Sequence, residues 1–265
     1  MLKTEMRNPK TTHIDKMSPL EIVQIMNEEN MVAVKAVEAE LPQVAKAIEA
    51  IAKALDNGGR LFYMGAGTSG RLGIVDAAEC PPTFGVSPDM VVGIMAGGLA
   101  AMVDARENRE DDPEASVAEL KARNLSEKDV VVGISAAGGA AYVLNAMNYA
   151  KSLGCVTVGI TSNKGSKIDL AADIAISPDT GPEVITGSTR LKAGTAQKLI
   201  LNMLSTGAMI QNGYVYENLM INLKPTNTKL KQRVISIVSD ITGEPAEQSE
   251  VRLENNDWNI REAIK

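Results

Sequence analysis

Two patterns of apolar positions alternate along the middle of the chain. Short runs rich in Val and Ile are typical of buried strands, and stretches with apolar residues at helical spacing separate them. The predicted strands are 60–64, 91–95, 130–134, 156–160 and 174–176. The predicted helices are 69–78, 98–108, 114–123, 140–153, 166–171 and 192–211. Buried strands separated by helices predict an α/β fold with a parallel sheet covered on both faces.

Both ends of the chain have a different, helical pattern. Residues 1–16 are polar and are expected to form an arm. Ser18-Pro19-Leu20-Glu21 predicts a helix start, with a serine cap, a proline in the first helical position and a capping-box glutamate. This helix is expected to end near Glu28. A second helical stretch follows over 31–55, which Pro42 kinks or divides.

The C-terminal part is predicted as a connection over 215–225, a helix from 226 onward and a two-helix appendage over 244–265. The chain stops inside a helical pattern, which suggests a shortened C-terminal region. The predicted division is a helical arm over 1–55, a central domain over 56–214 and a helical region over 215–265.

Composition narrows the possible chemistry. The chain has one histidine, His13, and two cysteines, Cys80 and Cys155, which are too few for a His/Cys metal site or a disulfide framework. Its formal net charge is −6 and only 3% of its residues are aromatic, which argues against nucleic acid as a partner. No apolar run is long enough to span a membrane, so we expect a cytoplasmic protein. The chemistry is expected to rest on carboxylates, hydroxyls, amides, lysine and arginine.

A glycine-rich turn directly follows the first predicted strand. Its sequence, GAGTSGR over 65–71, formally satisfies the dinucleotide pattern GxGxxG, but the second strand ends in Met95-Ala96-Gly97 without the acidic residue that binds the ribose. A glycine turn at a helix start instead suits a phosphate, which would contact Gly67, Thr68, Ser69 and Gly70. The alternative is a plain turn in which Ser69 only caps the helix.

Three further segments carry candidate side chains. Glu79 stands just before Pro81 and Pro82, which are expected to end a helix and to place Glu79 at its terminus on the binding side of the sheet. A charge run covers 104–112, and spacing alone singles out none of its carboxylates. Residues 182–190 precede the long helix and form a second anion-ready start. For each segment, an ordinary solvated or capped helix end is the alternative.

Two longer stretches of this sequence resemble a known family. GAGTSGRLGIVDAAECPPTFG over 65–85 and GSTRLKAGTAQKLILNMLSTGAMI over 187–210 resemble the N-acetylmuramic acid 6-phosphate etherases, which belong to the wider sugar isomerase (SIS) phosphosugar-binding fold. The resemblance implies an SIS-type doubly wound five-stranded parallel sheet and a homodimer with its sites near the subunit interface. It also implies a lyase that removes D-lactate from a phosphorylated amino sugar during peptidoglycan recycling, with no cofactor.

The resemblance also assigns roles to residues. Glu79, in the ECPPT motif, and Glu110 correspond to the two acid/base glutamates of the family, although Arg109 beside Glu110 differs from the family pattern. We expect Glu79 to protonate the leaving lactyl oxygen and Glu110 to act as the base at C2. The substrate and its phosphate are expected to contact the following residues: Gly67, Thr68, Ser69, Gly70, Ser135, Gly138, Glu183, Ser188 and Thr189.

One loop departs from the family pattern. Relatives carry a Ser-Gly-Arg-Thr-Pro loop after the third strand, whereas this chain has SAAGGAA over 135–141, so Ala137, Gly139 and Ala140 replace the expected serine, arginine and threonine. Each lost hydrogen bond to a ligand would cost about 1 kcal/mol. This loop leaves open a non-catalytic phosphosugar sensor related to the glucokinase regulatory proteins. A phosphosugar isomerase or deaminase, which would use the same removal of the C2 proton, is a second alternative to the etherase.

Overall fold

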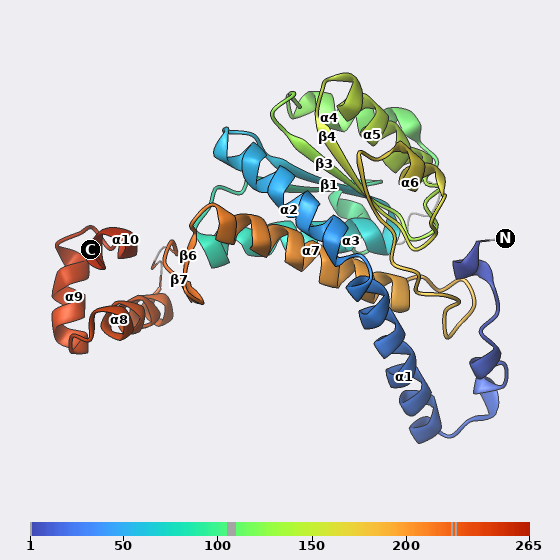
Figure 1. The fold of residues 1–265 in the computed structure, drawn as a ribbon, viewed down its shortest axis with the longest axis horizontal. Coiled ribbons are helices and arrows are strands. Elements are labelled where there is room, and N and C mark those ends of the chain that lie inside the picture. The colour runs from blue at the N-terminus through green and yellow to red at the C-terminus, as the bar shows by residue number, and fades with distance from the viewer. Residues whose placement is uncertain (1, 105–109, 224, 226) are drawn as a thin grey trace.

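The computed structural model describes residues 2–104, 110–223, 225 and 227–265. Its centre is a parallel sheet of five strands in the order β2-β1-β3-β4-β5, drawn in Figure 1. The strands are β1 (Leu61–Gly65), β2 (Val91–Met95), β3 (Val130–Ile134), β4 (Val156–Ile160) and β5 (Ile174–Ile176). The five predicted strands and the parallel sheet are confirmed, with β1 displaced by one residue.

Helices cover both faces of this sheet. One face packs against α2 (Leu41–Asp56), α3 (Gly67–Phe84) and α7 (Lys192–Gln211), and the other packs against α4 (Pro113–Ala122), α5 (Ala141–Ser152) and α6 (Lys167–Ala171). Neighbouring residues of β1 alternate between the two cores: Leu61 and Tyr63 belong to the first, and Phe62 and Met64 to the second. The doubly wound arrangement is thereby confirmed.

Helix boundaries correct three sequence expectations. The first helix does not end near Glu28: α1 (Pro19–Glu38) continues because Glu29 is buried against α7, and the break before α2 falls at 39–40. The prolines do not end α3, which runs to Phe84 and stops at Gly85, a left-handed residue with φ 64°. Burial of Cys80 and Phe84 holds this last turn on the core.

The third correction concerns the helix predicted over 98–108. Within the described residues this region contains only the short 3₁₀ turn η4 (Leu99–Met102). Residues 105–108 of the predicted helix lie outside the described residues. The other helices predicted between the strands are present, with ends shifted by a few residues.

The N-terminal arm is anchored to the body of the protein. It contains three 3₁₀ turns, η1 (Lys3–Glu5), η2 (Pro9–Thr11) and η3 (Ile14–Lys16). Thr11 Oγ1 donates to the carbonyl of Val184 at 2.8 Å, and Asn163 Nδ2 donates to Thr4 Oγ1 at 3.0 Å. The arm therefore packs against loops that follow the sheet.

The C-terminal region forms a separate small cluster. A short antiparallel pair, β6 (Val215–Tyr216) with β7 (Leu219–Met220), lies where only a connection was expected. Three helices follow, α8 (Thr228–Thr242), α9 (Ala246–Glu254) and α10 (Ile260–Ala263), and they share their own apolar core. Figure 1 shows them away from the sheet. The division of the chain at residues 55 and 214 stays a prediction.

Candidate functional site

The carboxyl ends of β1 and β3 form the place where the sheet topology favours a ligand. The chain leaves β1 toward β2 on one side, while β3 begins the other half of the sheet, so the loops after β1 and β3 diverge. Gly65 at the end of β1 pairs with Ile134 at the end of β3. The predicted residues Gly67–Gly70 and Ser135–Gly138 directly follow these two strand ends, so the structure brings both groups to one edge.

The glycine turn depends on its glycines for steric reasons. Gly67 has a φ of 52°, in the left-handed region. A Cβ on Gly70 would lie 2.5 Å from Met95 Cβ and 2.7 Å from the carbonyl oxygen of Gly65. The turn therefore packs tightly between β1 and β2, while Gly67 remains exposed and Thr68 half-buried at its outer side.

The helices that follow these two strands begin without side-chain caps. Ala66 precedes α3 and Ala140 precedes α5, and neither residue supplies a capping oxygen. The first-turn N–H groups of a helix have no intrahelical acceptor and carry its positive dipole end. In α5 the N–H of Tyr142 donates to the Glu110 carbonyl at 3.0 Å. Two helix starts that lack a side-chain cap thus lie at the same edge of the sheet.

Hydrogen bonds within the loop after β3, and from neighbouring residues, fix its shape. The N–H of Gly138 donates to the carbonyl of Ser135 at 3.1 Å and to its Oγ at 3.2 Å, which leaves the hydroxyl proton of Ser135 for another acceptor. The carbonyl of Ala136 accepts from Asn163 Nδ2 at 3.0 Å and from Thr161 Oγ1 at 3.2 Å. The loop therefore has a defined shape, despite its alanines and glycines.

The start of α7 contrasts with these two helix starts. The carboxylate of Glu183 is fully buried and accepts from the N–H groups of Lys192 at 2.9 Å and Ala193 at 3.0 Å. The anion-ready start expected over 182–190 is thus occupied by a carboxylate of the chain itself. Ser188 and Thr189 lie half-buried just before this helix. A role for these three residues in substrate binding stays a prediction.

The two predicted catalytic glutamates lie in different places. Glu79 is exposed in the interior of α3, twelve residues after Gly67, which corresponds to about 18 Å along the helix axis. The expectation that the prolines place it at a helix terminus is wrong, because α3 continues to Phe84. Its place on the binding side of the sheet stays a prediction. Glu110 is exposed, and its carbonyl contacts the first turn of α5, so its backbone lies at the ligand edge.

Sequence reasoning missed a buried ion pair beside the α7 start. Lys192 and Glu29 are 2% and 3% exposed and form an ion pair with Nζ and Oε2 2.5 Å apart. Burial raises the pKa of Glu29, but hydrogen bonds from Lys192, Lys10 and Asn8 outweigh it, so the pKa lies below the usual value of 4.5. Charged residues within otherwise apolar helix faces were the available signal, and it was too weak to identify partners far apart in sequence.

A second buried polar cluster lies between α3 and α7. Tyr63 Oη donates to Asp76 at 2.9 Å, and Asn202 Nδ2 donates to the same carboxylate at 2.6 Å. Burial raises the pKa of Asp76. Burial also raises the pKa of Cys80 to about 12, so this thiol is protonated at neutral pH. Within the described part of the chain, no group of His, Cys, Asp or Glu residues is arranged to hold a metal ion.

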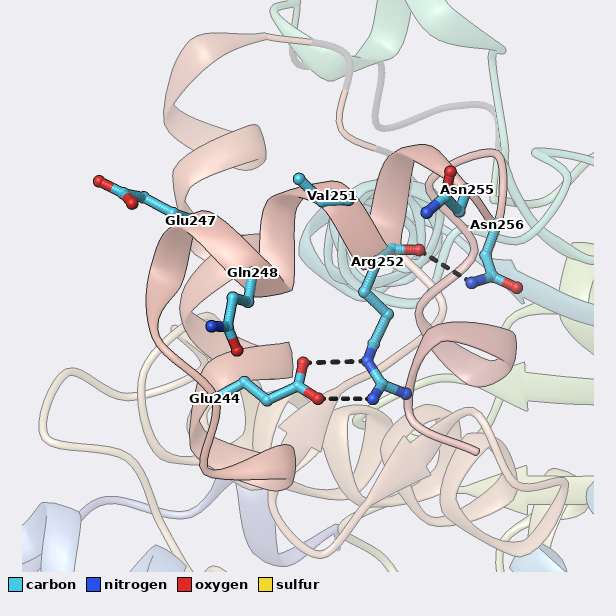
Figure 2. Close-up of a pocket in the computed structure, with 7 residues that line it drawn as sticks. All are labelled: Glu244, Glu247, Gln248, Val251, Arg252, Asn255 and Asn256. Atoms are coloured by element: carbon cyan, nitrogen blue, oxygen red, sulfur yellow. Dashed lines mark hydrogen bonds and ion pairs between the residues drawn. The ribbon is translucent and has the colours of Figure 1, made fainter.

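Surface hollows occur elsewhere as well. Figure 2 shows one in the C-terminal helices, of about 530 Å³, where Glu244 and Arg252 face each other through two contacts of 3.0 and 2.6 Å. Arg252 also donates to the carbonyl of Ala263 at 3.2 Å, so it ties these helices together. This hollow shares no residue with the glycine turn. No helix among the described residues is long and apolar enough to cross a membrane.

Comparison with known proteins defines the class first. Residues 113–207 match the SIS domain, and residues 43–151 match the glucokinase regulatory protein N-terminal SIS domain. A phosphoheptose isomerase from Francisella tularensis has a TM-score of 0.58 at 20% identity, covering 73% of this chain and all of the other. A phosphosugar isomerase from Bacteroides fragilis, described as putative in its own name, has the same TM-score at 21% identity, covering 76% of this chain and 95% of the other. The chain therefore has the SIS fold.

Curated relatives specify the family. N-acetylmuramic acid 6-phosphate etherase 2 of Vibrio parahaemolyticus is 54% identical over 99% of this chain and 88% of its own length. The etherases of Clostridium beijerinckii and Salmonella typhi are 51% and 50% identical over 99% of this chain, covering 86% and 89% of their own lengths. The chain belongs to the N-acetylmuramic acid 6-phosphate etherase family.

Proposed function

We propose that this protein cleaves the D-lactyl ether of N-acetylmuramic acid 6-phosphate to give N-acetylglucosamine 6-phosphate and D-lactate, as a carbon–oxygen lyase of peptidoglycan recycling in the bacterial cytoplasm. The observation that carries the proposal is identity of 50% or more, over 99% of the chain, with relatives named for this activity. The two helix starts without side-chain caps at one sheet edge support it, because they suit a phosphate monoester.

The phosphate is proposed to bind at the start of α3 and beside the loop after β3. The N–H groups of Gly67, Thr68 and Ser69 and the hydroxyl of Thr68 supply donors on one side. Ser135 supplies a hydroxyl donor on the other, and Gly138 gives the loop its left-handed turn with a φ of 75°. Gly70 allows the turn to pack closely, because a side chain there would collide with Met95 and Gly65.

The proposed reaction is an elimination followed by water addition. In the open-chain sugar, the C2 proton is acidic because it lies next to the aldehyde. Glu110 removes this proton as a base, the C3–oxygen bond breaks, and Glu79 protonates the departing lactyl oxygen. Water then adds to the double bond at C3 and restores the sugar. General acid–base catalysis by each carboxylate contributes roughly 10²- to 10⁴-fold.

The position of Glu79 supports a site shared between two subunits. Glu79 lies about 18 Å along the axis of α3 from the glycine turn, which is longer than a hexose phosphate and favours different chains as the sources of these two parts of one site. A homodimer in which Glu79 and Glu110 of one site come from different subunits satisfies this requirement. Exposed apolar side chains favour such contact: Leu20, Val23, Met31 and Val34 on α1, and Val75 on α3 one turn before Glu79.

Lactate release tests the activity. The purified protein with N-acetylmuramic acid 6-phosphate is expected to form D-lactate and N-acetylglucosamine 6-phosphate in equal amounts. Glu79→Gln and Glu110→Gln are each expected to lose at least 100-fold in kcat while they keep the wild-type Tm. Absence of lactate at high enzyme concentration would exclude the etherase.

Mixing the two inactive variants tests the shared site. If Glu79 and Glu110 of one site come from different chains, heterodimers formed after subunit exchange contain one intact site, and activity returns to about a quarter of wild type. If both come from one chain, the mixture stays inactive. Each variant exchanged with itself serves as the control.

A second candidate is a phosphosugar sensor without turnover. The match of residues 43–151 to the N-terminal SIS domain of glucokinase regulatory protein favours it, together with the SAAGGAA loop. Gly139 has open space where a side chain would begin, so Gly139→Arg can be made without steric conflict. Stabilisation by several phosphosugars without lactate release, unchanged in the triple variant Ala137→Ser, Gly139→Arg and Ala140→Thr, would favour the sensor.

A further inference from the structure

The carboxamide of Gln197 lies behind the glycine turn. Gln197 belongs to the second turn of α7 and is 2% exposed. Its Oε1 accepts a hydrogen bond of 3.0 Å from the hydroxyl of Ser69, the third residue of α3. Ser69 is itself 8% exposed. This contact links α7 to the helix start proposed to hold the phosphate.

The other polar atom of this carboxamide lacks a partner. Gln197 Nε2 is buried and has no hydrogen-bond acceptor among the described residues. A buried donor without an acceptor costs about 1 to 3 kcal/mol, and most buried polar groups are paired. Reversing the carboxamide does not remove the cost, because a hydroxyl both donates and accepts and the oxygen would then be unpaired.

Other amide side chains near α7 and the sheet edge are paired. Asn202 Nδ2 on the same helix donates to Asp76 at 2.6 Å, and Asn163 Nδ2 donates to the carbonyl of Ala136 at 3.0 Å. The nitrogen of Gln197 is joined to the same carbon as the oxygen that binds Ser69, so it lies beside the start of α3. Its unpaired donor therefore lies close to Ser69, which directly follows Gly67 and Thr68 in the first turn of α3.

We propose that Gln197 is a positioning residue of the phosphosugar site. Its Oε1 fixes the Ser69 hydroxyl, and its Nε2 donates to an oxygen of the bound sugar phosphate, directly or across one bound water. The free energy lost by an unpaired donor in the free protein is then recovered on binding. This inference rests on the proposed function, which supplies the phosphosugar.

Methionine at this position removes both polar atoms and keeps the length of the side chain. Gln197→Met is expected to raise the Kd for N-acetylglucosamine 6-phosphate, measured by isothermal titration calorimetry, about tenfold. The KM for lactate release is expected to rise similarly, with kcat within twofold of wild type. Tm is expected to change little, because the variant removes the unpaired Nε2 donor but also the acceptor of the Ser69 hydroxyl.

Gln197→Glu gives a second, independent measurement. The carboxylate still accepts from Ser69, but it places negative charge where the donor was, so a rise in Kd larger than that of Gln197→Met is expected. Asn202→Leu is the matched control: it removes a paired amide from the same helix, and it is expected to lower Tm and to leave Kd unchanged.

The outcomes separate this inference from the proposed function. A Gln197→Met protein with wild-type Kd and KM would overturn the role of Gln197 even if lactate is released. A wild-type protein that binds N-acetylglucosamine 6-phosphate without releasing lactate would refute the etherase, while the Kd of the variants would still decide the role of Gln197. A wild-type protein that binds no phosphosugar would refute both.

Discussion

The starts of α3 and α7 lie side by side and are built in opposite ways. A Cβ on Gly194, in the first turn of α7, would lie 3.6 Å from Thr68 Cγ2 in the first turn of α3. The start of α7 holds the Glu183 carboxylate, and Glu29 neutralises Lys192 beneath it. The start of α3 is preceded by Ala66, which provides no capping side chain.

This difference indicates which helix start serves a ligand. A buried carboxylate already satisfies the N–H groups and the dipole of α7, so a second anion there would be repelled. The N–H groups of α3 have no such partner from the N-cap residue. A polar cap stabilises a helix by about 0.5 to 2 kcal/mol, so its absence at α3 is consistent with a site that an external anion completes.

The largest expected effect comes from breaking the anchored start of α7. Glu29→Gln leaves the buried ammonium of Lys192 without its charged partner and is expected to lower the free energy of unfolding at pH 7 by about 3 to 5 kcal/mol. The folded pKa of Glu29 is lowered, so its carboxylate stabilises the fold above the unfolded pKa of about 4.5, and this contribution is lost as the pH falls through the folded pKa.

Urea unfolding of both proteins between pH 7 and pH 3 measures this prediction. The difference in the free energy of unfolding between wild type and Glu29→Gln is expected to be largest above pH 5 and to shrink as the pH falls below about 4.5. Lys10→Met, which removes the exposed partner of the same carboxylate, is the control and is expected to lower the free energy of unfolding much less than Glu29→Gln does. A gap that stays constant with pH would contradict the assignment.

The next effect tests the bare start of α3. Ala66 has an extended backbone, with φ −119° and ψ 155°, which suits a capping residue. Ala66→Asp gives α3 the carboxylate that α7 already has, and it is expected to raise the KM for the phosphosugar about 100-fold through repulsion, while Tm stays equal or rises. Ala66→Asn caps without charge and is expected to raise KM by less than about tenfold. Equal KM values for wild type and both variants would place the phosphate elsewhere.

Much of the central fold was predictable because buried strands have a local signature. The runs of Val and Ile at 130–134 and 156–160 are apolar at every position or nearly so, as a sheet covered on both faces requires. The glycine turn was predictable for a similar reason: a Cβ at 65 or 70 would collide with neighbouring backbone, and 67 has a left-handed φ that favours glycine. In a parallel sheet the carboxyl ends of the strands lie at one edge, so the glycine turn after β1 and the loop after β3 were expected there together.

The parts that were not predicted depend on contacts between distant residues. Pro81 and Pro82 predicted a helix end, yet the burial of Cys80 and Phe84 on the core continues α3 past them. Glu183 was taken as a substrate residue, whereas its bonds to the α7 amides are visible only in three dimensions. The position of Glu79 in the interior of α3, far from the glycine turn, likewise depends on the continuation of α3 to Phe84.

A smaller effect tests Glu183. Glu183→Ala leaves two buried N–H groups of α7 without acceptors and is expected to lower the free energy of unfolding by about 2 kcal/mol. The KM for the phosphosugar is expected to change less than threefold, because the lost bonds stabilise α7. A KM raised more than tenfold in a protein of wild-type stability would instead support the substrate role expected from the sequence.

The smallest effect is expected at Cys80, which adjoins Glu79 on α3. Its side chain is 2% exposed, and burial raises its pKa to about 12, so no thiolate is available near neutral pH. Cys80→Ala removes one buried sulfur and is expected to cost about 1 kcal/mol of stability through the small cavity it leaves. The kcat for lactate release is expected to stay within twofold of wild type, with Cys155→Ala as the matched buried control. A large loss of kcat at wild-type Tm would show that the thiol contributes to the chemistry beside Glu79, and the division of α3 into a binding start and a carboxylate-bearing interior would then have to include Cys80.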